Sequence, residues 1–239
     1  MITIKRWRVL LFGSLLTAGC LKQEDKTGEG PKAGILVVNA AIDAAPVNIL
    51  FDGQPIAPAD LAFGEYSFEE ENGYLRVKPG IRTIGWKFGS QMHSDDKYIS
   101  WDPGAYYTLL HYDTALNGAG SWLILKDQPQ STDSSARVRF INCVAGKDSL
   151  TLWLINSSDT LSVASKRAFI EYTGPVNTEF NLNVVAGEWR YELLDRELNI
   201  LDAAPLAIAP AGSYSFVGIG ETGSTGEKQP RLLSIRQVK

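Results

Sequence analysis

Four short sequence motifs occur twice in this chain, in the same order both times. The spacing between the two copies rises only from 103 to 108 residues along the chain. The matched pairs are Val38-Asn39 with Ile141-Asn142, Ala62–Tyr66 with Ala168–Tyr172, Val77–Gly80 with Val184–Gly187, and Pro103–Tyr106 with Ala211–Tyr214. Because chance would not keep both the order and the spacing of four matches, we interpret the chain as two homologous domains in tandem.

The repeat sets the expected domain boundaries at residues 34–126 and 136–239. Between them, Asp127–Ser135 is polar and has no hydrophobic pattern, so we expect this segment to be a linker. A domain of about a hundred residues is long enough to bury a core of its own. We therefore expect each repeat to fold around its own hydrophobic core.

Both repeats have the pattern of strands and turns rather than helices. Ile35–Asn39 is a continuous apolar run that ends in a turn-forming residue, as a buried strand would. Val47–Phe51 stops at Asp52-Gly53, a favoured two-residue hairpin turn, and Arg137–Ile141 alternates between polar and apolar residues. Turn signals recur about every ten residues, which predicts about seven short strands per repeat. The expected fold is all-β, with two tandem antiparallel β-sandwich domains of the immunoglobulin-like kind.

Composition and charge exclude one large class of partner. Hydrophobic residues make up 44% of the chain and charged residues 21%, which is ordinary for a protein with a packed core. After the first nineteen residues the chain carries 20 basic and 27 acidic side chains, a net charge of −7, and it has no basic stripe. Because nucleic-acid affinity comes mostly from neutralising phosphates, nucleic acid is not an expected partner.

The N-terminus has the pattern of an export signal. Lys5–Arg8 is basic, and Val9–Leu16 is apolar but shorter than the roughly 20 residues of a transmembrane helix. Small residues at Thr17–Gly19 then precede Cys20, as lipoprotein signal peptidase requires, although leucine is commoner than Thr17. We predict that Met1–Gly19 is a lipoprotein signal peptide and that Cys20 carries the lipid. The alternative is an ordinary secretory signal followed by a chance cysteine.

The residues after Cys20 bear on the location of the protein. Leu21, rather than an acidic residue, follows the cysteine, which favours the outer membrane. Lys22–Lys26 is a short charged run that resembles the lipoprotein surface-export signal of Bacteroidetes. Its other interpretation is a solvated tether that continues to residue 33. The sequence leaves both the periplasmic and the cell-surface orientation open.

Several motifs of the first repeat resemble one protein family. Val38–Gly53 is similar to the opening motif of the domain of unknown function 4397 family, and Ala62–Tyr66, Val77–Gly80 and Pro103–Thr108 resemble its later blocks. The second repeat is more divergent, because Cys143–Ser149 replaces the Pro-Asp-Ala-Pro segment of that family. The resemblance implies exported β-domains, often in tandem on lipoproteins, and it brings no known catalytic residues.

Residues that often carry catalysis are few and scattered. The chain has two histidines, His93 in an expected loop and His111 on an expected strand, and it lacks the Gly-x-Ser-x-Gly motif that would present a nucleophilic serine. Cys143 follows a strand end with no histidine nearby in sequence, so a buried structural thiol is favoured over a nucleophile. We therefore expect neither enzymatic activity nor a cofactor.

Two further patterns match ligand motifs only in part. Gly218–Gly223 fits G-x-G-x-x-G, but a loop follows it instead of the helix that a dinucleotide site needs, so a hairpin loop is expected. Asp95-Asp96 with Asp102, and also Glu69–Glu71, lack the alternating spacing of calcium ligands. Solvated loop charges are the simpler interpretation, and no metal site is predicted.

The tryptophans offer the most direct route to a ligand. Trp86, Trp153 and Trp189 stand in apolar strand contexts and are expected in the cores. Trp101 and Trp122 border expected loops, where an exposed indole ring would stack on the apolar face of a sugar.

These features predict a non-enzymatic lipoprotein of the outer membrane or cell surface that serves as a protein-binding or structural module of the envelope. The alternative is a glycan-binding accessory lipoprotein for polysaccharide capture or uptake, with stacking at Trp101 and Trp122. The expected partners are the membrane, through the lipid at Cys20, and either an envelope protein or a glycan.

Overall fold

The computed structural model describes residues 30–67, 73–112, 121–129, 134–146, 149–170 and 179–237, without the side chains of residues 93–97. These residues form sixteen β-strands, and they contain no α-helix. No helix among them is long and apolar enough to cross a membrane. The all-β expectation is confirmed. The predicted signal peptide Met1–Gly19, the lipidated Cys20 and most of the tether lie outside the described residues.

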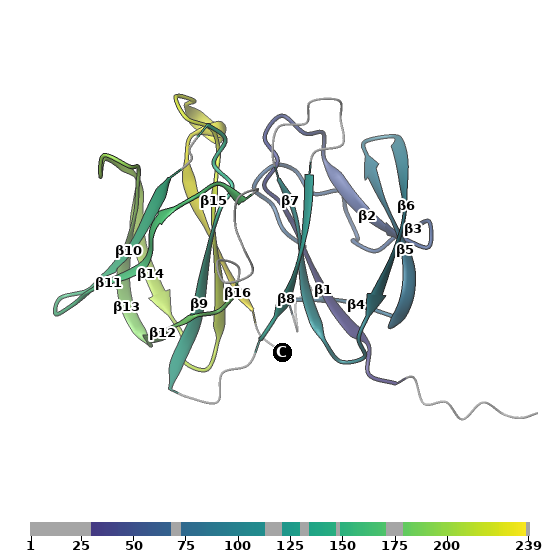
Figure 1. Cartoon of the computed structure of the whole chain (residues 1–239), viewed down its shortest axis with the longest axis horizontal. Coiled ribbons are helices and arrows are strands. Elements are labelled where there is room, and N and C mark those ends of the chain that lie inside the picture. The colour runs from purple at the N-terminus through teal and green to yellow at the C-terminus, as the bar shows by residue number, and fades with distance from the viewer. Residues whose placement is uncertain are drawn as a thin grey trace, which may run out of the picture. The chain divides into compact units, whose positions relative to one another are not determined.

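The first repeat is a sandwich of two four-stranded sheets (Figure 1). One sheet has the strand order β4-β1-β7-β8, and the other has the order β3-β2-β5-β6. The strands are β1 (Ala33–Asn39), β2 (Val47–Phe51), β3 (Gln54–Pro55), β4 (Leu75–Val77), β5 (Gly80–Phe88), β6 (Gln91–Trp101), β7 (Tyr106–Tyr112) and β8 (Ser121–Asp127).

The second repeat has the same topology with every strand number raised by eight. Its sheets have the orders β12-β9-β15-β16 and β11-β10-β13-β14. The strands are β9 (Ser135–Asn142), β10 (Leu150–Ile155), β11 (Thr160–Arg167), β12 (Leu182–Val185), β13 (Gly187–Leu194), β14 (Ile200–Ile208), β15 (Ser213–Ile219) and β16 (Arg231–Gln237). Eight strands per repeat replace the expected seven.

The strand order departs from the immunoglobulin arrangement. In an immunoglobulin sandwich the first two strands share a sheet, whereas here β1 and β2 lie in different sheets. One ladder per repeat, β1 with β7 and β9 with β15, is parallel, and the other strand ladders are antiparallel. The sandwich is confirmed, and its immunoglobulin-like character is not.

The matched Val-Asn and Ile-Asn motifs form the same corner after the first strand of each repeat. The side-chain oxygen of Asn39 accepts a hydrogen bond from the backbone N–H of Ala41 (3.2 Å), and that of Asn142 accepts one from Val144 (3.0 Å). An asparagine that bonds two residues ahead closes a turn locally. The repeat in the sequence therefore corresponds to the same asparagine-closed turn in both repeats.

Strand β1 is apolar from Ala33 to Val38 because both of its faces are covered. Along β1, Ile35 and Val37 point into the core of the first sandwich, while Leu36 and Val38 belong to a third core cluster. That third cluster also contains residues of the second repeat, such as Val217 and Ile235. Full burial of an aliphatic side chain stabilises a fold by about 1.5–3 kcal/mol. The repeats therefore share a core in addition to their own.

Residues Pro31–Lys239 accordingly form one compact unit. Contacts beside the shared core join the repeats as well: Lys228 pairs with Asp43, and the guanidinium of Arg231 lies 5.1 Å from the ring centre of Phe63. The predicted linker, residues 127–135, overlaps the last residue of β8 and the first of β9. Its residues 130–133 lie outside the described part of the chain.

Candidate functional site

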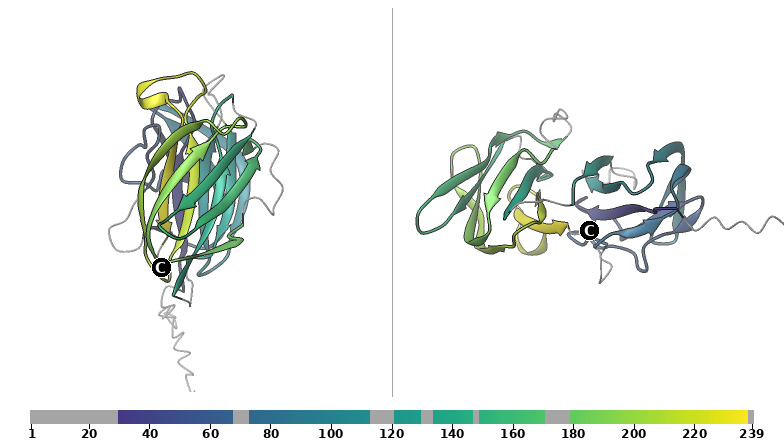
Figure 2. Two further views of the ribbon diagram at one scale, coloured as in Figure 1. Left: turned by 90° about the vertical axis from the view of Figure 1, so that its left-hand side faces the viewer. Right: turned by 90° about the horizontal axis from the view of Figure 1, so that it is seen from below.

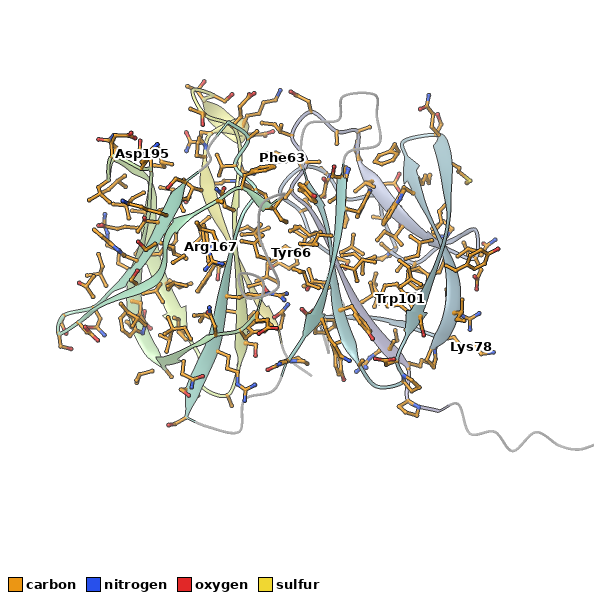
Figure 3. All side chains as sticks on the ribbon, viewed as in Figure 1. Phe63, Tyr66, Lys78, Trp101, Arg167 and Asp195 are labelled. Carbon is orange, nitrogen blue, oxygen red and sulfur yellow. The ribbon has the colours of Figure 1, made fainter. Side chains whose placement is uncertain are left out.

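Trp101 borders the turn between β6 and β7 as expected, but its side chain is buried, so the expectation of an exposed indole ring is wrong. It is the last residue of β6 and is only 1% exposed. Its indole packs between Phe51 and Tyr107, at ring-centre distances of 5.3 and 4.9 Å (Figure 3). Its strand partner is Gly80, which has no side chain to compete for the space. A sugar has no access to this ring.

Trp122 is half-buried and already stacked. Its ring lies parallel to that of Trp86, with ring centres 3.4 Å apart, and nearly parallel to that of His111 at 4.3 Å. These contacts occupy ring surface that a sugar would need. Trp86 and Trp189 are buried as expected, and Trp153 is half-buried.

His111 has a structural environment. The residue is completely buried, and its Nδ1 lies 3.0 Å from the side-chain oxygen of Asn39. Asn39 in turn donates to the carbonyl of Leu61 at 3.0 Å. The core of the first sandwich covers the ring, with the ring centres of Phe88 and Trp122 at 5.5 and 4.3 Å. His93 lies on β6 instead of in a loop, and its side chain is outside the described atoms.

Cys143 is the buried structural thiol that the sequence favoured. It belongs to the core cluster shared by the repeats and is unpaired by any disulfide. Burial raises the pKa of its thiol far above the ordinary value. A thiol that stays protonated and has no solvent access is not a nucleophile.

The G-x-G-x-x-G match is a hairpin loop, as expected. Gly218 and Ile219 end β15, and the loop that follows contains only a three-residue 3-10 helix, Gly226–Lys228, before β16 (Figure 2). Gly220 has a φ of +111°, and a Cβ at this position would lie 2.5 Å from the carbonyl oxygen of Gln229. The glycine is there because the loop folds back on itself.

The candidate calcium ligands do not come together in the part of the protein that is described. Asp102 pairs with Lys126 at 3.1 Å. Glu69–Glu71 and the side chains of Asp95 and Asp96 lie outside the described atoms. Within the described residues, no group of three or more histidine, cysteine or acidic side chains is placed to hold a metal ion.

A buried polar network connects the repeats, and sequence reasoning missed it. Asp127 at the end of β8 pairs with Arg139 of β9 at 2.6 Å, and both side chains are fully buried. Asp127 also accepts hydrogen bonds from Thr108 (2.7 Å) and Tyr74 (3.0 Å). Arg139 donates to Ser215 at 2.7 Å. The pair therefore neutralises two charges inside the protein.

Tyr74 of this network does not act as an acid or base at neutral pH. Burial, followed by the charge of Asp127, raises the pKa of Tyr74 far above its ordinary value, so its hydroxyl stays protonated.

The Arg139 guanidinium lies 4.4 Å from the ring centre of Phe180. Beside it is a hollow of about 340 Å³, lined by Ile124, Leu125, Lys126, Asp127, Gln128, Glu179 and Phe180.

The turn between β13 and β14, residues 195–199, is longer than its counterpart in the first repeat. The equivalent turn of the first repeat, between β5 and β6, has only two residues, Gly89 and Ser90. The longer turn exposes two large apolar side chains, Leu198 (53%) and Ile200 (54%) at the start of β14. An insertion that exposes apolar residues points to an interaction surface.

Asp195 holds this turn in one conformation. Its Oδ1 accepts hydrogen bonds from the backbone N–H groups of Glu197 (3.0 Å) and Asn199 (2.9 Å), and its Oδ2 accepts one from the Asn199 amide (3.2 Å; Figure 3 labels Asp195). Leu198 has a φ of +66°, in the left-handed region that a bulky residue rarely adopts. Strain of this kind often marks a functional position. The turn therefore presents a rigid apolar tip.

The chain is thus an all-β protein of two sandwiches with matching topology. It belongs to the family described as Domain of unknown function (DUF4397), whose sequence profile matches residues 33–153, just over half of the chain. The match covers the first repeat and extends through β9 into β10. The predicted family resemblance is confirmed, and the match does not extend over the rest of the second repeat. No curated protein matches the sequence.

Proposed function

We propose that this protein is a non-enzymatic lipoprotein of the outer membrane or cell surface, and that its second repeat binds a protein partner in the envelope. The basic, apolar and small-residue segments before Cys20 support the lipid anchor. An acylated cysteine would keep the body at the membrane, where its partner would also be found.

The observation that carries the binding role is the apolar tip at Leu198 and Ile200. Protein interfaces gain most of their affinity from a few apolar anchors that enter a pocket on the partner. A tip already fixed by Asp195 loses little conformational entropy on binding. Both features suit recognition of a protein surface.

The burial of the reactive side chains supports a role without catalysis. His111 and Cys143 are both inaccessible to a substrate. The glycan-binding alternative has lost its main support, because Trp101 is buried and Trp122 stacks on neighbours within the protein. A protein partner therefore fits the described surface better than a sugar.

The test is site-specific photo-crosslinking in the native cells. Benzoylphenylalanine at Leu198 is expected to give one discrete crosslinked product, and the same probe at the exposed Val185 of β12 serves as the matched control. Adding Asp195→Ala should weaken the crosslink because the turn loses its hydrogen-bonded frame. Equal products at the two positions, or no product at Leu198, would refute the binding role of the turn.

A further inference from the structure

The chain enters the first repeat at one particular end of the sandwich. Pro31 lies next to Gly104 in the turn between β6 and β7, and the backbone N–H of Gly34 donates to the carbonyl of Ala105 at 2.9 Å. The strand register places the β4–β5 turn and the end of β8 at the same end. We call this surface the tether end, and it comprises Asp52 and residues 31–32, 76–82, 98–105 and 126.

The tether end is basic on an otherwise acidic body. Its basic residues are Lys32, Arg76, Lys78, Arg82 and Lys126. Its acidic residues are Asp52 and Asp102, which pair with Arg82 (2.9 Å) and Lys126 (3.1 Å). Lys78 stands exposed in the β4–β5 turn (Figure 3). Among the described residues of this end, five cations stand against two anions, whereas the chain after its first nineteen residues has a net charge of −7.

Two large apolar side chains are exposed beside these cations. Ile81 on β5 is 69% exposed, and Tyr98 on β6 is 73% exposed. In the ladder, Ile81 pairs with Ser100 and Thr83 pairs with Tyr98, so Ile81 and Tyr98 are diagonal neighbours on the outer face of the sheet. Tyrosine is enriched where proteins meet the membrane–water interface, because its ring is apolar and its hydroxyl is polar.

The length of the tether keeps this end near the bilayer. Ten residues lie between Cys20 and Pro31, and the eleven Cα–Cα steps that join the two reach about 40 Å at most. The tether end is also the part of the body that follows directly on the tether in the chain. This step rests on the proposed lipidation of Cys20.

We propose that the tether end docks on an anionic lipid surface, with its lysines and arginines against the lipid phosphates and with Ile81 and Tyr98 in the interface. A juxtamembrane cation gains energy from anionic lipid over about one Debye length. The lipid would hold the protein at the membrane, and this face would set which way the first repeat points.

The test uses the chain without residues 1–19 and with Cys20→Ser, so that docking is measured without any lipid anchor. Co-sedimentation is measured with phosphatidylcholine vesicles that contain either no phosphatidylglycerol or about a third of it. Binding is expected only to the anionic vesicles, and it should weaken as salt is added. The variant Lys78→Glu/Lys126→Glu should bind at least about tenfold more weakly, because each lost cation accounts for about fivefold.

Two further variants keep the test decisive. Lys166→Glu/Arg196→Glu makes the same change in net charge within the second repeat and should bind like the parent chain. Ile81→Ser/Tyr98→Ser should weaken binding several-fold without changing the charge. Equal binding to both kinds of vesicle, or an equal loss in the Lys166→Glu/Arg196→Glu variant, would overturn the proposal. Because the assay uses no acyl chain, its outcome is independent of whether Cys20 is lipidated in cells.

Discussion

At the scale of single residues, the most consequential feature is the buried pair of Asp127 and Arg139. Both charges have left water completely, and the cost of doing so is offset only because each partner is present and further hydrogen bonds satisfy the pair. Tyr74 and Thr108 supply two of these bonds from the first repeat. Removing Asp127 takes this carboxylate away from a guanidinium that is fully buried.

We therefore predict that Asp127→Ala lowers the free energy of unfolding by about 3–5 kcal/mol, the typical effect of breaking a buried pair. The double variant Asp127→Leu/Arg139→Met should recover much of this loss, because it removes both charges together. Urea denaturation followed by circular dichroism measures the free energy of unfolding of both variants. A change below about 1 kcal/mol for Asp127→Ala would contradict the pairing described here.

At the scale of strands and turns, the predictions that succeeded are those that depend on local pattern. The apolar run Ile35–Asn39 indicated a buried strand, and Asp52-Gly53 indicated a hairpin turn; both are present. Asp127, Arg139 and Trp101 were not predictable in the same way. Their burial depends on what covers the other side of their sheet, and a charge on an alternating strand looks the same whether it faces water or a second domain.

Two of the strands at sheet edges, β6 and β14, have features that limit pairing with another chain. The ladder between β5 and β6 shifts register between Ile84 and Gly85, and β14 contains Pro205, which has no N–H to offer a neighbouring strand. Both devices discourage another chain from extending the sheet. Binding through the Leu198 tip leaves these protected edges unused.

The strained turn yields a prediction about stability. Leu198→Gly should raise the free energy of unfolding by about 0.5–1 kcal/mol, because glycine accepts a positive φ without the clash that leucine suffers, less its entropic cost. Leu206→Gly in the neighbouring strand should instead destabilise the protein. Thermal unfolding of the Leu198→Gly and Leu206→Gly variants compares their stabilities. If Leu198→Gly proves as destabilising as Leu206→Gly, the turn is not strained at that position.

At the scale of the whole molecule, the two repeats act as a single body. The repeats share a third core and a buried ion pair, so that Pro31–Lys239 forms one compact unit. The reactive side chains His111 and Cys143 are inside it. The described surface presents the basic tether end and the apolar tip at Leu198. This arrangement suits a body that is held at a membrane and binds a partner without catalysis.

Metabolic labelling of the native cells with an alkyne analogue of palmitate, followed by membrane fractionation, tests the proposed anchor most directly. We predict that the wild-type chain is labelled and found in the membrane fraction, and that Cys20→Ser abolishes the label and releases the protein. Cys143→Ser serves as the control and should keep the label. A wild-type chain that is unlabelled and recovered in the soluble fraction would contradict the account.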